Sequence, residues 1–371
     1  MMAKQSIKFI VVLLLVLVSF KSFASDGPSH HHAGGNVIDT PQEIKAHIKH
    51  HLKDSHDFHL FSDNAAGKHY GFSLPVIVWT SQGLKTFMSS EFHHDDAGHV
   101  VVDKDGVKLT KMHSKIYELD AGAAAVAFDD AHHATNAHKV LDLSITKSVL
   151  GMLVAGLLMF LGFVSLAKGY KKGPIPTGLG RLLEPLVIYV RDDIARPNIG
   201  EKKYRKFMGF LLTVFFFIWI LNLLGLTPLG FNVTGQIAVT ACLAIFTVVI
   251  YLFSGSKDFW AHTLWMPGVP VILRPILAVI ELVGFLLIKP FSLLIRLFAN
   301  MTAGHFVVMS LIALMITLKE SFGAVGSTGM SLVLALFISV IEILVAFLQA
   351  FIFTMLSSLF IGMAVEEHDH H

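Results

Sequence analysis

Five long apolar segments constrain the fold of this chain more than any other feature of its sequence. Approximately, they cover residues 144–167, 207–226, 235–253, 271–318 and 331–365. About 20 apolar residues suffice for a helix to cross the hydrocarbon core of a bilayer, where only helices and closed barrels satisfy every backbone hydrogen-bonding group. Since 54% of the 371 residues are hydrophobic and only 15% are charged, we predict an all-α polytopic membrane protein with about five membrane helices.

The last two apolar segments are too long for helices that cross a bilayer at right angles. We therefore expect them to be tilted, or kinked near Pro275 and Pro290. A Gly- and Ser-rich stretch at 321–329 is expected to form the turn between them. The short, uncharged link at 227–230 predicts a helical hairpin between the second and third segments.

Residues 1–24 have the layout of a secretory signal peptide. Lys4 and Lys8 precede an apolar run at 9–20, and small residues favour cleavage before Ser25. An uncleaved anchor is the alternative, although the run is short for a membrane span.

Residues 25–142 are polar and are expected to form a small extracytoplasmic domain, which leaves 143–371 as the membrane domain. Alternating apolar residues at 70–79 and turn signals at 95–98 and 103–106 predict a few short strands. The domain holds 16 of the 21 histidines. Imidazole binds zinc, copper and nickel, but the irregular spacings assign no metal site. Proton buffering by such histidines, including 30–32 and 132–133, is a comparable interpretation.

The loop between the first and second apolar segments is strongly basic. Between residues 168 and 206 there are ten Lys or Arg against four Asp or Glu. Because cytoplasmic loops carry an excess of basic residues, we expect this loop and the C-terminus in the cytoplasm, on the side opposite to the N-terminal domain. Within the loop, residues 179–190 are typical of an amphipathic helix on the membrane surface.

Arg296 lies in the middle of the fourth apolar segment. A guanidinium at this depth costs roughly 3 kcal/mol on insertion scales, and such a cost usually marks a pathway for charge. Asn300 follows four residues later on the same helix face, whereas His305, nine residues on, lies near the opposite side. On the fifth segment, Glu342 and Gln349 are seven residues apart and share a face.

An antiparallel pair of these two segments would bring the polar residues to comparable depth. We expect Arg296 opposite Gln349 and His305 near Glu342, a row that can hold water and pass protons. Each residue alone has a plainer explanation. Asn300 and Gln349 could be helix-packing amides, and His305 a satisfied buried histidine. Glu342 and Arg296 could form a structural ion pair. Several ionisable groups on two helices favour the proton route.

Two motifs at these positions resemble subunit a of the F-type ATP synthases. They are IRLFANMTAGH at 295–305 and IEILVAFLQAFIFTMLSSLFI at 341–361. The stretch NLLGLTP at 222–228 and the pair Lys289-Pro290 agree with them. The resemblance covers the chain from about residue 144 to its end. The histidine-rich N-terminal domain is much longer than the N-terminus usual in that family.

The resemblance implies the membrane stator of a rotary machine in the inner membrane of a bacterium, with a periplasmic N-terminal domain. Protons would reach a ring of c subunits through two aqueous half-channels. Subunit b of the peripheral stalk and the rest of the ATP synthase would be further partners. Arg296 would separate the half-channels and favour the deprotonated c-subunit carboxylate, since a nearby positive charge lowers the pKa of a carboxyl group.

The resemblance also assigns the remaining polar residues. Asn300 and Gln349 would line the site and position the arginine. His305 and Glu342 would be the imidazole and the acid of the proton path, exchanged between helices relative to many bacterial members. Glu281 would be a further acid. A sodium-translocating version of the subunit is the alternative, followed by a histidine-rich metal-ion transporter, which fits a central arginine less well.

Neither catalysis nor a cofactor is expected of this chain alone. It lacks the phosphate-binding pattern G-x-x-x-x-G-K-[ST]. Its single cysteine, Cys242, lies in an apolar segment and excludes an intrachain disulfide. A net charge of +2 gives no reason to expect a nucleic acid as partner.

Overall fold

The computed structural model describes residues 54–63, 68–120, 122–123, 125–127, 134–173, 178, 180–227, 231–265, 270–317 and 319–366. These residues form two compact units. The first contains residues 55–146, and the second contains Asp54 together with the residues from Lys147 onward. The expected signal peptide and histidines 30–32 and 132–133 lie outside the described residues.

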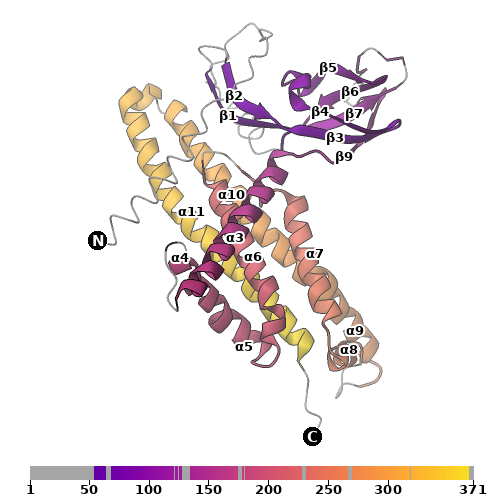
Figure 1. The fold of residues 1–371 in the computed structure, drawn as a ribbon, viewed down its shortest axis with the longest axis vertical. Helices are drawn as coiled ribbons and strands as arrows, with labels where there is room; N and C mark the ends of the chain where they lie inside the picture. The colour runs from indigo at the N-terminus through magenta and orange to yellow at the C-terminus, as the bar shows by residue number, and fades with distance from the viewer. Residues whose placement is uncertain are drawn as a thin grey trace. The chain divides into compact units, whose positions relative to one another are not determined.

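The first unit consists of antiparallel strands in three small sheets (Figure 1). One sheet pairs β1 (Asp57–Asp63) with β2 (Lys68–Ser73). In the second, β3 (Pro75–Thr80) lies between β4 (Gly83–Met88) and β9 (Leu141–Asp142). The third has the order β5 (Ala97–Lys104), β6 (Val107–Met112), β7 (Lys115–Leu119) and β8 (Ala137–Lys139). A short 3-10 helix, Ser89–Phe92, follows β4.

Buried apolar residues alternate with more exposed ones along the strands, and the buried ones form an apolar core in this unit. On β3, Val76 and Val78 are fully buried, and they belong to one cluster with Leu109 of the third sheet. The predicted strands and the turn at 103–106 are confirmed. Asp105 and Gly106, with φ angles of 52° and 85°, make the two-residue loop of the β5–β6 hairpin, a position that favours Asp-Gly.

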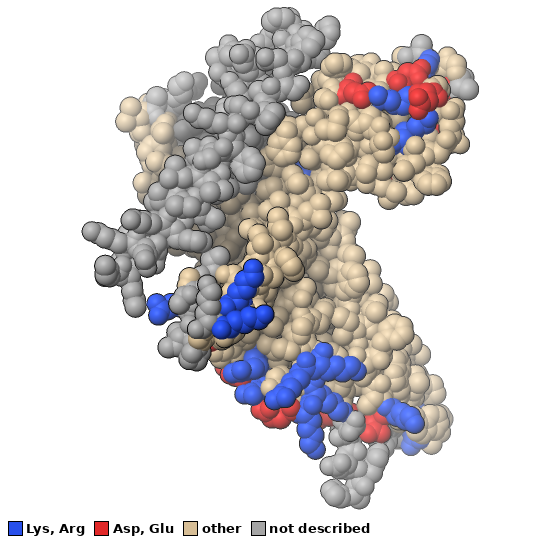
Figure 2. Space-filling view, viewed as in Figure 1, with Lys and Arg blue, Asp and Glu red and all other residues tan. Residues whose placement is uncertain are grey.

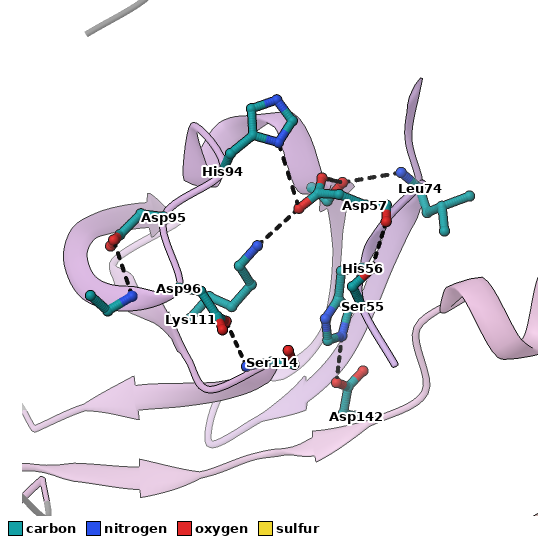
Figure 3. Close-up of polar contacts among 12 residues, drawn as sticks. Ser55, His56, Asp57, Leu74, His94, Asp95, Asp96, Lys111, Ser114 and Asp142 are labelled. Atoms are coloured by element: carbon teal, nitrogen blue, oxygen red, sulfur yellow. Dashed lines mark hydrogen bonds and ion pairs between the residues drawn. The ribbon is translucent and has the colours of Figure 1, made fainter. Parts of the chain in front are cut away.

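Two polar side-chain pairs join segments of this unit that are distant in the sequence (Figure 3). The Lys111 ammonium, only 5% exposed, donates to the Asp57 carboxylate of β1 at 2.9 Å. His56 Nε2 lies 2.7 Å from Asp142 Oδ2 of β9. Burial opposes ionisation of Asp142, but hydrogen bonds from His56 and Ser144 keep the pKa of that carboxyl below its usual value. These histidine and lysine side chains therefore serve the folding of the unit.

The second unit is helical and confirms the predicted fold class. Long apolar helices are α3 (Lys147–Lys172), α6 (Tyr204–Gly225), the continuous run Arg274–Leu311 and α11 (Lys319–Val365), whereas α7 (Ile237–Phe253) is a shorter one. The continuous run consists of α9 (Arg274–Val283), the π-helical segment Gly284–Ile288 and the first part of α10 (Lys289–Thr317). The connecting elements are α4 (Gly180–Tyr189), the π-helical segment Val190–Ala195, α5 (Arg196–Ile199) and α8 (Lys257–Leu264).

Small side chains let α11 approach its neighbours closely. Ala350 and Ser357 are fully buried, and a Cβ on Gly362 would overlap the backbone carbonyl of Asn198 in α5. The Ser358 hydroxyl donates to the backbone carbonyl of Ile194 at 3.0 Å. Small and hydroxyl-bearing residues at helix contacts are characteristic of packing in membranes, where no hydrophobic force draws helices together.

The turn between the last two helices is tighter than the sequence predicted. Residues 321–329 were expected to form the turn, but among the described residues only Gly323 leaves the helical conformation, with φ 71° and ψ 168°. Glycine adopts a positive φ without steric strain. The turn lies within the predicted stretch but is shorter, because Gly and Ser are tolerated in membrane helices and the apolar helix resumes at Val325.

Pro290 alters the helix that precedes it, where a kink was predicted. In the π-helical segment Gly284–Ile288 a backbone N–H bonds the carbonyl five residues earlier, and Pro290 has no N–H to offer. The carbonyl of Phe285 would therefore lack a donor. The hydroxyl of Tyr251 from α7, a fully buried side chain, donates to that carbonyl instead.

Replacing Tyr251 by Phe should destabilise the helical unit. The change leaves the Phe285 carbonyl buried without a donor, which costs about 1–3 kcal/mol, and should lower the melting temperature of the purified protein in detergent. Tyr170→Phe is the matched control, because the Tyr170 hydroxyl donates to Glu184 at an exposed site. Equal melting temperatures for the two variants would contradict the proposed role of Tyr251.

Candidate functional site: a polar seam between the last two helices

Helices α10 and α11 lie side by side in opposite directions (Figure 1). Three contacts follow one another along both helices: the Ser331 hydroxyl with the Leu311 carbonyl, Glu342 beside Gly304, and Asn300 with Gln349. The polar residues that the sequence singles out on these two helices therefore reach similar depths in one helix pair.

Asn300 and Gln349 are joined by a side-chain hydrogen bond. Asn300 Nδ2 donates to Gln349 Oε1 at 2.8 Å. Gln349 is only 3% exposed, and its Nε2 is buried with no hydrogen-bond partner among the described residues. One half of this amide is thus fixed by the neighbouring helix, while the other half remains able to donate.

Two more buried polar atoms in this helix pair lack partners among the described residues. They are the Oε1 atom of Glu342 and the hydroxyl oxygen of Thr302. Buried polar atoms in proteins nearly always have a partner, either protein or water. We call Asn300, Glu342 and Gln349 the polar seam, and its open hydrogen-bonding capacity suits water molecules in a row. Thr302, two residues from Asn300, lies near the opposite side of α10.

Arg296 lies one helical turn before Asn300 on the same face of α10. Its neighbours Leu293 and Leu297 are buried, whereas Arg296 is partly exposed. No ion pair between Arg296 and Glu342 exists in the described part of the chain, where Glu342 Oε1 has no partner. The alternative that these two residues neutralise each other is therefore wrong for this structure.

The structure supports the other expected contacts and positions of the site residues less well. Gln349 contacts Asn300 rather than Arg296, which was expected opposite it. His305 follows Gly304 in α10, next to the position where Glu342 approaches, but its side chain lies outside the described residues. Glu281 lies on α9 and is partly exposed, and the described hydrogen bonds and ion pairs do not connect it to the polar seam.

Two residues of α10 near the seam were missed in the sequence. Gly304 leaves room for Glu342, since a Cβ there would lie 2.7 Å from Glu342 Oε1. Thr302 contributes the buried hydroxyl. A glycine beside His305 was the available signal, because small residues mark close helix contacts in membranes.

Asn222, interpreted from sequence as a packing amide, is confirmed in that role. Asn222 Nδ2 donates to the Ala346 carbonyl of α11 at 3.3 Å, and its Oδ1 accepts from the Thr234 hydroxyl at 2.8 Å. Both polar side chains are buried. The pair fixes the hairpin of α6 and α7 against α11.

These features define a polytopic helical membrane protein that has a polar seam between two apolar helices and a single arginine, Arg296, within one of them. Comparison with known families agrees. Residues 149–362 match the family described as ATP synthase A chain, and residues 47–143 match a domain of unknown function (DUF8433). The chain belongs to the ATP synthase A chain family.

Bacterial relatives give the same result. ATP synthase subunit a of Chloroherpeton thalassium is 45% identical over 62% of this chain and 69% of its own length. ATP synthase subunit a 2 of Chlorobaculum tepidum is 44% identical over 62% of this chain and 66% of its own length. The chain thus spans about two thirds of both relatives. With subunit a 2 of Prosthecochloris aestuarii, 40% identity extends over 76% of this chain and 83% of the relative.

Gly304→Ala tests whether the position of Glu342 matters. The added methyl group would collide with the flexible end of Glu342, at 2.7 Å from Oε1, so the carboxyl group should move while the helices stay packed. We expect ATP-driven ion pumping by the assembled complex to fall several-fold. Gly329→Ala, where a Cβ would meet nothing within 4 Å, is the control. Equal pumping in both variants would remove Gly304 from the site.

Proposed function

We propose that this chain is the ion-conducting stator subunit of a rotary ATP synthase, with two aqueous half-channels that lead to a ring of c subunits. The observation that carries the proposal is Arg296, a charge in an apolar helix without a carboxylate partner among the described residues. A charge at that depth is costly, and a carboxylate supplied by another subunit explains why it is present. The peripheral stalk and the catalytic sector would be the further partners, and this chain would not be catalytic by itself.

Arg296 acts on each carboxyl group that passes it. A positive charge nearby favours the ionised form and lowers the pKa of the carboxyl group. The ion is therefore released on one side of Arg296 and taken up again on the other, and the fixed charge prevents direct passage between the half-channels. Asn300 lies one helical turn after Arg296 on α10 and is held to Gln349 of α11 at 2.8 Å. These two side chains line the site next to Arg296.

The polar seam forms part of one half-channel. Glu342 and Gln349 each have a buried atom open to a water molecule. Glu342 and His305 can each gain and lose a proton, which favours protons over sodium as the transported ion. Glu281 is assigned to the same pathway from the family resemblance alone.

Basic residues support the orientation of the chain in the membrane. In Figure 2, Lys and Arg gather at one end of the helical unit, while most of the visible helix surface is uncharged. That end carries α4, α5 and the π-helical segment between them, where Arg191 and Arg196 each pair with Asp192 at 2.8 Å. The positive-inside rule places it in the cytoplasm and the N-terminal domain in the periplasm.

A metal-ion transporter receives less support. Among the described residues, no three His, Cys, Asp or Glu side chains come together in a way that could hold a metal ion. A sodium-driven stator differs from the proposal only in the transported ion. Synthesis of ATP driven by a proton gradient in sodium-free medium separates the two.

Arg296→Ala is the decisive variant. We expect loss of both ATP synthesis and ATP-driven pumping in membrane vesicles, because the passing carboxyl group would no longer be deprotonated, while the complex still assembles. Arg181→Ala, at an exposed site on α4, is the control and should retain both activities. Coupled pumping in the Arg296→Ala complex would refute the proposal.

An exchange variant tests the cooperation of His305 and Glu342. The double variant His305→Glu with Glu342→His keeps both titratable groups, so it should retain more pumping than His305→Ala or Glu342→Ala. All three complexes need equal assembly for the comparison. If the exchange is as damaging as the single alanine changes, the two residues do not share one proton path.

A further inference from the structure

The β4-β3-β9 sheet of the first unit has an exposed apolar face. Trp79 in the middle strand pairs with Leu84 on one side and with Leu141 on the other. Their side chains are 58%, 53% and 62% exposed, respectively. Large exposed apolar patches on a folded domain mark contacts with proteins or membranes.

This face carries no charged side chain. Successive residues of a strand point to opposite sides of a sheet, and the charged residues of these strands, Lys85 and Asp142, fall on the other side. Lys85 pairs with Asp105, and Asp142 pairs with His56. The outer face consists of Pro75, Ile77, Trp79, Leu84, Thr86, Met88, Leu141 and Leu143.

The same sheet continues almost directly into a membrane helix. The backbone N–H of Leu143 donates to the Ile77 carbonyl at 2.8 Å, and that of Ile145 donates to the Pro75 carbonyl at 3.1 Å. The chain therefore stays paired with β3 as far as Ile145, and α3 begins at Lys147. Two residues reach at most about 7 Å, so the end of this sheet lies within that reach of the first residue of α3, a helix long and apolar enough to cross a membrane.

We propose that the outer face of the β4-β3-β9 sheet rests on the lipid bilayer. The side chains of Leu153, Leu157 and Phe160 on α3 are also exposed, as expected for a helix that faces lipid. Lipid is therefore already present where the sheet joins α3, whereas a protein partner would have to bind there. Tryptophan suits the boundary of a membrane, since its ring is apolar and its N–H can reach water or a head group. The proposal is independent of which ion the chain transports.

Photocrosslinking in the assembled complex tests this contact. We replace Leu84 by p-benzoylphenylalanine, irradiate the complex in its own membrane and measure the mass of this chain. The matched control carries the same residue in place of Lys115, an exposed position on β7 of the other sheet. Both sites are exposed, so folding and assembly should be unchanged, and the yield of purified complex verifies this.

The expected result is a phospholipid adduct at position 84 that is at least several-fold more abundant than at position 115. An adduct with a protein subunit at position 84 would overturn the proposal in favour of a protein partner. Equal lipid adducts at both positions, or no adduct at position 84, would also overturn it.

Discussion

The helical unit depends on one constraint: in hydrocarbon, no backbone polar group can be left without a partner. Continuous helices satisfy this rule, and where Pro290 interrupts the hydrogen bonding, the Tyr251 hydroxyl supplies the missing donor. The rule applies to side chains as well. Asn222 and Thr234 are both satisfied in the same interior, so the open atoms of Thr302, Glu342 and Gln349 stand out against it.

The sequence predicted the membrane helices well because apolar length is a local property. It also predicted that residues around 300 and 349 lie at similar depth, since antiparallel helices and their spacing determine this. It did not predict which residue of α10 meets Gln349. That choice depends on the rotation of the two helices about their axes, which is determined by the close approach of Glu342 at Gly304 and not by any periodic pattern.

The N-terminal unit was harder to interpret, because its histidines suggested ligands or proton buffers. Where the structure describes them, some have structural roles, such as His56 against Asp142. Short strands were predicted from alternation, but their pairing into three sheets depends on contacts distant in sequence. The 76% of the chain aligned with the Prosthecochloris aestuarii relative is more than the helical unit contains, so the relative shares part of the strand-rich unit. The unit is therefore shared, at least in part, with this relative.

Arg296 has no carboxylate partner among the described residues, and this follows from its proposed task. Two unit charges 4 Å apart interact by about 4 kcal/mol at an effective dielectric constant near 20, which corresponds to roughly three pKa units. A carboxylate of the same chain held at that distance would cancel most of this field. A carboxyl group on a moving subunit would then meet a neutral pair, and its pKa would stay high. The separation of Arg296 from Glu342, with Asn300 bound to Gln349 between the two levels, keeps the charge available for a partner that comes and goes.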